Sequence, residues 1–419
     1  MKTKTATINP LIEKRTTDSK FFSICVFILL AGIYLFPEKI KIISIVYIIL
    51  MLLFVLTHTK TMKINYAPLV PWIFFVIIGL LTTMLCGVSA ITDAVEFIIS
   101  IAIGMIVQSI YVKNDSKKGV LIAVFAVSVI AFLGCCLQLF APSLLLKFNS
   151  FSLGAEKYET FMTFYSYNYL AGFSYQTGVT GHYLAIFIGF LLCYGLFEKN
   201  MTKMVRIISI GLAIVGYLLL FLTGKRGELL IVALLGFMLV CYRFRKHFLK
   251  ILGIGAVMAI AGVCLLVFTE EGRFLLERTF GDSPLSGRDV IYSQLIEVFE
   301  KNILLGAGFS SVLKFIEGFT NGHNIYLQLL AENGIVGFVT LMAIFLFNVI
   351  LTVKVIIRKT TKTDDVTLAI MSLFIQLHFL LAGLIGNPLY DVYPLIVYML
   401  SVGVAHYLNL KKGNNNENR

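Results

Sequence analysis

Charge is scarce in this sequence. Only 14% of the 419 residues are charged and 58% are hydrophobic, whereas soluble domains carry about 25% charged residues. The seven cysteines lie inside apolar segments and none has the CxxC spacing of a metal or redox motif, so packing is their simplest role. No small-residue cleavage site follows the first apolar run, which ends in "YLFPEK". We therefore interpret that run as a retained membrane span and not as a signal peptide.

Long apolar runs occupy most of the chain. A helix needs ~17–25 residues to cross the hydrocarbon core of a bilayer. The sequence predicts an all-α polytopic membrane protein with about twelve spans, at residues 21–36, 40–56, 68–86, 95–111, 120–140, 179–197, 205–222, 228–242, 248–268, 334–353, 366–386 and 393–408.

Lysine and arginine are absent from two predicted loops, "GVSAITDAVE" and "GNPLYDVYP". The segments on the N-terminal side of the membrane carry 24 of the 35 basic residues, and basic loops stay in the cytoplasm. We expect a multi-pass protein of the cell inner (cytoplasmic) membrane with both termini cytoplasmic. Residues 1–20 then form a cytoplasmic segment, residues 21–408 the bundle and residues 409–419 a cytoplasmic tail. The net charge of +12 is thus a topology signal and argues against nucleic-acid binding.

The two long loops, residues 141–178 and 269–333, fall on the outer side, while the inner loops are short, so we expect any chemistry at the outer face. The second loop contains "SGRDVIYSQLIEVFEKNILLGAG", which predicts an amphipathic helix. Ser286 and Asp289 have the spacing of a capping box. An apolar stripe through Ile291, Leu295 and Phe299 follows.

Three cations of the outer segments are candidates for holding an anion. Arg288 lies in the first turn of the predicted helix, where backbone N–H groups and a guanidinium both favour negative charge; the alternative is a solvent-facing arginine. The loop holds five basic and nine acidic residues, so an anion there would need placed arginines. Lys225 and Arg226, in "TGKRG", lie at an outer turn between glycines; the alternative is snorkelling at the membrane interface.

The stretch "GHNIYLQLLAENGIVGF", residues 322–338, gathers polar residues before an apolar run. We expect Thr320 or Asn321 to cap a short helix near His323, with Asn324, Gln328 and Glu332 on one face because they are four residues apart. An imidazole at such a helix start tends to stay neutral, which suits a general base. A structural histidine is the alternative. Of the six histidines, only His182 and His323 are predicted to lie outside.

Three motifs in this order resemble the O-antigen ligase/polymerase family: "TGKRG", "GRDVIY…LLGAGF" and "GHNIYLQLLAENGIVGF". The resemblance is strongest over about residues 222–338. It implies a metal-independent, cofactor-free membrane glycosyltransferase that uses a saccharide linked to undecaprenyl diphosphate. It also implies that Arg226 and Arg288 hold the diphosphate and that His323 takes the proton of the attacking hydroxyl.

The resemblance further implies supporting or substrate-binding positions at Asn324, Tyr326 and Glu332. Lys225 stands where many relatives have a small polar residue, so either cation of "TGKRG" could hold the phosphate. His182, at the outer end of the sixth span, is a further lining residue. The chemistry agrees with these residues, because guanidiniums stabilise the charge that develops on a leaving diphosphate. No D-x-D sequence lies outside, which fits a lipid-linked donor.

Two activities of that family remain open. A polymerase joins lipid-linked repeat units, while a ligase moves the finished chain to lipid A–core or another acceptor. The residues of the histidine motif are more similar to the polymerase branch, so the resemblance favours a polymerase. A chain-length regulator is then an expected partner. The alternative outside enzymes is a transporter or flippase. It is disfavoured because the span centres offer few ionisable residues and no inverted repeat is visible.

Overall fold

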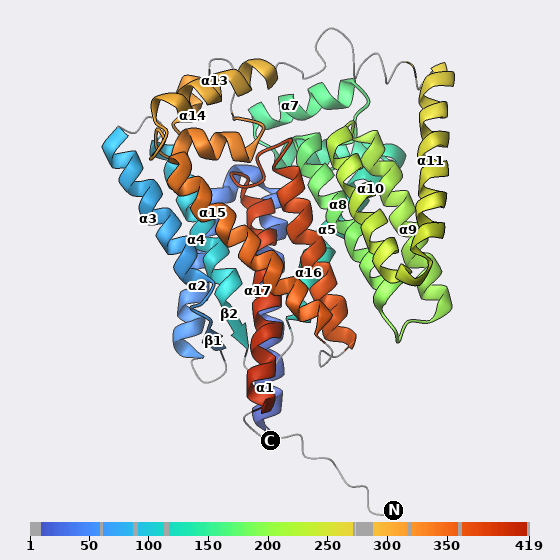
Figure 1. Cartoon of the computed structure of the whole chain (residues 1–419), viewed down its shortest axis with the longest axis horizontal. Coiled ribbons are helices and arrows are strands. Elements are labelled where there is room, and N and C mark those ends of the chain that lie inside the picture. The colour runs from blue at the N-terminus through green and yellow to red at the C-terminus, as the bar shows by residue number, and fades with distance from the viewer. Residues whose placement is uncertain are drawn as a thin grey trace, which may run out of the picture.

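The computed structural model describes residues 10–58, 62–86, 91–112, 117–270, 273, 288–316, 321–358 and 363–416. Figure 1 labels its helices and strands along the chain. Their bounds are α1 (Pro10–Leu35), η1 (Pro37–Lys39), α2 (Ile40–Thr57), β1 (Met62–Ile64), α3 (Leu69–Cys86), α4 (Ile91–Ser109), β2 (Ile110–Val112), α5 (Lys118–Phe140), α6 (Pro142–Ser152), α7 (Ala155–Ser166), α8 (Thr177–Phe197), α9 (Lys203–Leu222), α10 (Arg226–Arg243), η2 (Arg245–His247), α11 (Phe248–Phe268), α13 (Arg288–Lys301), α14 (Val312–Phe315), α15 (Ile325–Ile357), α16 (Thr363–Ala382) and α17 (Val392–Asn416).

Ten helices of the described residues are long and apolar enough to cross a membrane. This confirms an all-α polytopic membrane protein, because a helix satisfies its own backbone groups in lipid. The other two predicted spans are also helical. Residues 68–86 form α3, whose apolar part, Leu69–Leu85, is shorter. Residues 228–242 lie in α10, which starts two residues earlier than predicted and is not among the ten.

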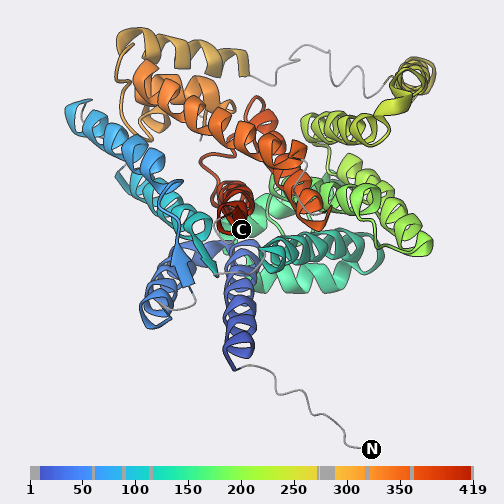
Figure 2. The same ribbon diagram turned by 60° about the horizontal axis from the view of Figure 1, so that its bottom comes forward.

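The most buried helix, α17, runs through the middle of the bundle. In its apolar window 83% of the residues are buried, compared with 0% for α11. Figure 2 shows α17 nearly end-on with the other helices around it, and Figure 1 shows α11 at one edge. The exposed apolar side chains of α11 are therefore available to lipid. The buried core of the bundle therefore surrounds α17, and α17 fixes the position of the helices that pack on it.

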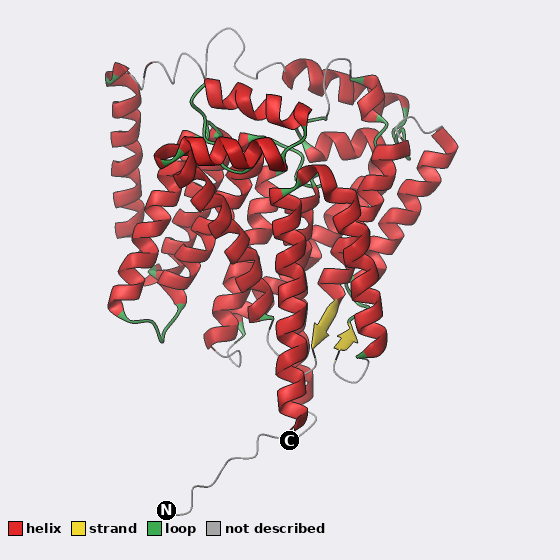
Figure 3. Cartoon of the chain, turned by 180° about the vertical axis from the view of Figure 1, so that it is seen from behind, coloured by secondary structure: helices red, strands yellow, loops and turns green. Residues whose placement is uncertain are grey.

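The two long predicted loops form short helices at one end of the bundle, called here the upper end. Helices α6 and α7 come from residues 141–178, and α13 and α14 come from residues 269–333. Seen from behind, short helices lie across this end while the long helices run below them (Figure 3). The buried stripe of α13 consists of Ile291, Leu295 and Val298, so Val298 takes the place predicted for Phe299.

A small antiparallel sheet, which the all-α prediction did not include, lies at the opposite, lower end. Strands β1 and β2 pair with Met62 opposite Val112. The start of α1 and the end of α17 also reach the lower end (Figure 1). The first residues of α1 and the last residues of α17 therefore lie at the same end of the bundle.

Candidate active site

His323 occupies a strained turn directly before α15. Its φ is 50°, a left-handed conformation that few residues other than glycine adopt. The side chain of Asn321 accepts a hydrogen bond from the His323 N–H at 3.3 Å. Tyr292 of α13 donates to the His323 carbonyl at 3.4 Å. The turn places a half-buried imidazole at the upper end of the bundle.

Asn324 is the N-cap of α15. Its Oδ1 accepts hydrogen bonds from the backbone N–H groups of Tyr326 at 2.9 Å and Leu327 at 3.2 Å. The prediction of Thr320 or Asn321 as the cap is therefore wrong for Asn321, while Thr320 lies outside the described residues. The N-cap of a helix is the residue at which extended backbone meets the first helical turn, and an Asn there can accept from the free N–H groups. Because of the turn at His323, this residue is Asn324.

The end of α16 holds the start of α15 in place. Gly383 O accepts from the Ile325 N–H at 2.9 Å, and Leu380 O accepts from the Tyr326 hydroxyl at 2.6 Å. The Asn324 side-chain amide donates to Leu384 O at 3.4 Å. Since these are backbone acceptors, the position of His323 depends on α16 as well as on its own segment.

The polar stripe predicted on this helix is an internal network. Glu332 is fully buried and accepts from Gln328 Nε2 at 3.0 Å and from the Tyr390 hydroxyl at 2.7 Å. Gln328 Oε1 accepts from the Gly322 N–H at 2.9 Å and from Asn387 Nδ2 at 2.5 Å. The network ties the turn before His323 to the loop before α17. Glu332 thus supports the turn and does not face an open site.

A kink at Gly334 separates the short helix from the long apolar one, at the residue where the predicted span 334–353 begins. Gly334 has φ 59° and ψ −167°, a region open almost only to glycine. The loop after α13 covers the kink: Ile303 O and Leu304 O accept from the N–H groups of Ile335 at 2.9 Å and Val336 at 3.2 Å. The motifs "LLGAGF" and "ENGIVGF" are therefore packed against each other.

Arg288 is the first residue of α13, which packs on the short helix of α15 through Ile291 and Leu295. Its side chain is half-buried. The predicted capping residue Ser286 lies outside the described residues. Because α13 is fixed on α15 and reaches His323 O through Tyr292, Arg288 is held at the same end of the bundle as His323.

Lys225 and Arg226 lie in the tight turn between α9 and α10. Gly224 turns the chain with φ 72°, and Thr223 Oγ1 accepts from the Lys225 N–H at 3.3 Å. Gly178 of α8 packs on Lys225: a Cβ there would lie 3.6 Å from Lys225 Nζ. Arg226 follows as the first residue of α10 and is half-buried.

The charges of Lys225, Arg288 and His323 act on one another. Burial lowers the pKa of His323, and the positive charges of Arg288 and Lys225 lower it further. The pKa of Lys225 is lowered by burial and by Arg288, and is raised in part by Glu228. Three side chains from segments far apart in sequence therefore share one electrostatic environment. The lowered pKa of His323 favours the neutral imidazole, and the positive charges of Lys225 and Arg288 favour an anion in this environment.

A buried cluster that the sequence did not predict lies beside this group. Glu228 is 6% exposed. His378 Nε2 lies 2.7 Å from its Oε2, and His182 Nδ1 lies 3.1 Å from its Oε1. The ligand atoms of the three residues lie within 4.8 Å of one another, and two histidines with a glutamate are a known zinc donor set. The His378–Glu228 contact is a hydrogen bond, whereas His182 lies within ion-pair distance of the same carboxylate, so α8, α10 and α16 together form a buried His–Glu–His cluster.

Two signals in the sequence could have found this cluster. Glu228 stands two residues after Arg226 at the start of a span, and His378 lies inside another span. Ionisable residues within spans usually pair with one another. His182 was predicted to line the site, and it is placed between Glu228 and the upper ends of α1 and α17.

Part of the chain matches a known protein family. Residues 211–342 match the family model described as O-antigen ligase, whose members are glycosyltransferase-like enzymes. The matched stretch contains Lys225, Arg226, Arg288 and His323. No curated protein matches the chain.

Proposed function

We propose that this chain is a membrane glycosyltransferase of the O-antigen ligase/polymerase family, whose model matches residues 211–342, and that it polymerises oligosaccharide repeat units linked to undecaprenyl diphosphate. The reaction takes place at the upper end, which the distribution of basic residues assigns to the outer face of the cytoplasmic membrane. The observation that carries the proposal is the electrostatic group of Lys225, Arg288 and His323 within the matched stretch.

The chemistry follows from these charges. An acceptor hydroxyl attacks the anomeric carbon of the donor sugar, and the bond from that carbon to the diphosphate oxygen breaks. Neutral His323 takes the hydroxyl proton. Arg288 and Lys225, with Arg226 beside them, stabilise the negative charge on the departing lipid diphosphate, and such stabilisation is strongest in a site that excludes water. Asn324 and Glu332 hold the base in position, and the step uses neither a metal nor another cofactor.

The description of the matched family favours a second candidate, an O-antigen ligase. A ligase would use the same donor and the same residues but would transfer the whole chain to lipid A–core or another terminal acceptor. Both activities can be read from a deletion strain on one gel. Loss of a polymerase leaves a single repeat on the acceptor, and loss of a ligase leaves long chains on undecaprenyl diphosphate.

Complementation of that strain tests the site. We expect His323→Ala to lower transfer by ~100- to 10,000-fold, the usual contribution of a general base. Arg288→Ala should abolish transfer, and Arg288→Lys should restore only part of it because the guanidinium fork is lost. Lys301→Ala is the matched control, since Lys301 is exposed at the other end of α13 and pairs only with Glu297 among the residues described. Normal polymer from His323→Ala or Arg288→Ala, at normal protein levels, would show that the site is misassigned.

A further inference from the structure

Lys225 is a half-buried cation whose side chain lies along the start of α8. A Cβ added at Gly181 would lie 3.7 Å from Lys225 Cβ, and a Cβ added at Gly178, one turn nearer the upper end, would lie 3.6 Å from Lys225 Nζ. The ammonium therefore points towards the upper end of the bundle. Among the described residues it makes neither an ion pair nor a hydrogen bond.

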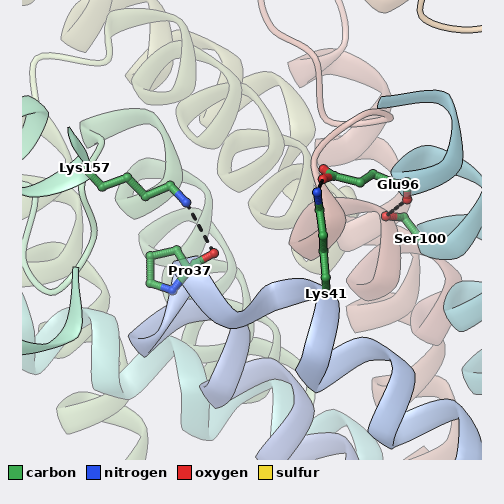
Figure 4. Close-up of polar contacts among 5 residues, drawn as sticks. All are labelled: Pro37, Lys41, Glu96, Ser100 and Lys157. Carbon is green, nitrogen blue, oxygen red and sulfur yellow. Dashed lines mark hydrogen bonds and ion pairs between the residues drawn. The ribbon is translucent and has the colours of Figure 1, made fainter. Parts of the chain in front are cut away.

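Other lysines at the upper end have a direct partner. Figure 4 shows Lys41 of α2 paired with Glu96 of α4, and Lys157 of α7 donating to Pro37 O at 3.3 Å. In each case an oxygen of the protein already binds the ammonium that an anionic ligand would need. Lys225 differs, because its ammonium stays available to a bound anion.

Most of the charge around Lys225 is positive. The charged or titratable groups near it are Arg226, His182 of α8, Glu228 of α10, Arg288 of α13 and His323 before α15. The free N–H groups at the start of α8 add a partial positive charge. Burial and Arg288 lower the pKa of Lys225, and Glu228 raises it. An ammonium in such surroundings loses its proton more readily than in water unless a carboxylate compensates.

Glu228 is placed to compensate. Lys225 is the N-cap of α10 and Glu228 follows three residues later, so both side chains lie on one face of the first turn. Both also lie against Gly181 of α8, where an added Cβ would be 3.4 Å from Glu228 Cγ. The charge of Glu228 therefore acts on Lys225 from the same turn of the same helix.

Two histidines keep this carboxylate from pairing directly with Lys225. Glu228 Oε2 accepts a hydrogen bond from His378 Nε2 at 2.7 Å, and Glu228 Oε1 faces His182 Nδ1 at 3.1 Å. Each oxygen thus has a neighbour on another helix. A carboxylate held in this way still attracts the ammonium, because Coulombic interactions extend beyond contact distance in a site that is partly shielded from water. The ammonium keeps its proton and all three of its N–H donors.

From these contacts we propose that Glu228, held by His182 and His378, is a positioning residue that keeps Lys225 cationic while leaving its ammonium free to bind the diphosphate. The proposal rests on the proposed function, in which Lys225 and Arg288 stabilise the departing diphosphate. It gives the buried His–Glu–His cluster a part in that reaction, which Glu228 performs through Lys225 and without contact with the substrate.

The first test measures the protonation of Lys225 in the purified full-length protein. Acetic anhydride acylates only neutral amines, so acetylation of Lys225 against pH, read by mass spectrometry, gives the midpoint of its titration. Glu228→Gln removes the charge at nearly constant size. We expect it to lower this midpoint by about one pH unit, a tenfold change in proton affinity.

Two further variants accompany this measurement. Glu228→Asp keeps the charge, so its midpoint should stay within about half a pH unit of the wild type; it also keeps the test open if Glu228→Gln does not fold. Glu297→Gln is the matched control, because Glu297 is exposed on α13 and pairs with Lys301, and its midpoint should equal that of the wild type. An unmoved midpoint in Glu228→Gln, or a shift of a full unit in Glu228→Asp, overturns the proposal.

The second test is the pH dependence of transfer from lipid-linked saccharide. Glu228→Gln should move the alkaline limb of the pH–rate profile to lower pH by the same amount as the acetylation midpoint. In Lys225→Arg the guanidinium stays protonated, so the added substitution Glu228→Gln should move no limb. A purely structural role for Glu228 would instead lower the rate at every pH with either residue at position 225, and that result also overturns the proposal. Absence of transfer by the wild type contradicts the proposed function, and the acetylation midpoints then still show whether Glu228 controls the charge of Lys225.

Discussion

Replacement of Asn324 by alanine tests how the base is positioned. The Asn324 side chain accepts from two backbone N–H groups, at 2.9 and 3.2 Å, directly after His323. Loss of an N-cap of this kind costs ~1 kcal/mol, with a range of ~0.5–2, which corresponds to a change of up to ~30-fold in the local equilibrium. We therefore expect transfer by Asn324→Ala to fall by at most ~30-fold, less than the loss expected for His323→Ala.

Asn324→Ser separates the cap from direct substrate binding. A serine hydroxyl caps a helix about as well as an asparagine, but it cannot reproduce the amide that donates to Leu384 O. If the cap is what matters, the initial rate of transfer from lipid-linked saccharide should return to near the wild-type value. Hydrogen exchange of the peptide amides at the start of α15 should rise in Asn324→Ala and recover in Asn324→Ser.

Two results would refute this reasoning. If Asn324→Ala keeps the wild-type rate while its first-turn amides exchange faster, the cap does not position His323. If Asn324→Ser is as slow as Asn324→Ala although exchange is restored, Asn324 contacts the substrate itself, as the family resemblance also allows. Equal thermal midpoints for both variants are the control for a general loss of stability.

The spans could be predicted from the sequence because each depends on local composition. A run of apolar residues can satisfy its own backbone groups in lipid by forming a helix whatever its neighbours are, so each of the twelve predicted spans is helical over most of its length. The two short strands could not be predicted in this way. Residues 62–64 of β1 pair with residues 110–112 of β2, and a three-residue strand has no recognisable hydrophobic period.

The candidate site could be predicted only one segment at a time. Lys225, Arg288 and His323 are far apart in the sequence, and helix packing brings their segments together. The absence of a side chain at Gly178 leaves room for Lys225, and its absence at Gly383 leaves room for Ile325. Nothing local indicates which glycine meets which side chain. The start of the long apolar run at Gly334 could be predicted from the sequence, whereas the kink there and its partner loop at residues 303–308 could not.

The cluster of His182, Glu228 and His378 was even harder to predict from the sequence. Glu228 and His378 are 150 residues apart, and each alone reads as an isolated polar residue in a span. A buried carboxylate needs a partner, so the residue type predicts that a partner exists without identifying it. Only the packing of α10 between α8 and α16 identifies the partners as His182 and His378.

Two further substitutions test the electrostatics and the kink. The pKa of His323 is lowered below its ordinary value of ~6.5 in part by the charge of Lys225, and transfer requires the neutral imidazole. Lys225→Gln should raise that pKa and move the acidic limb of the pH–rate profile to higher pH, whereas Lys301→Gln should not; an unmoved limb contradicts the shared environment. Gly334→Ala should destabilise the protein by more than ~1 kcal/mol, because its φ of 59° suits glycine and an added Cβ would overlap the backbone of the loop after α13. Gly211→Ala, where a Cβ meets nothing within 4 Å, is the control in thermal unfolding. Since the same loop covers the kink and follows the helix that carries Arg288, a normal midpoint for Gly334→Ala would mean that the loop is not fixed against α15, and the placement of Arg288 at the same end of the bundle as His323 would lose one of its supports.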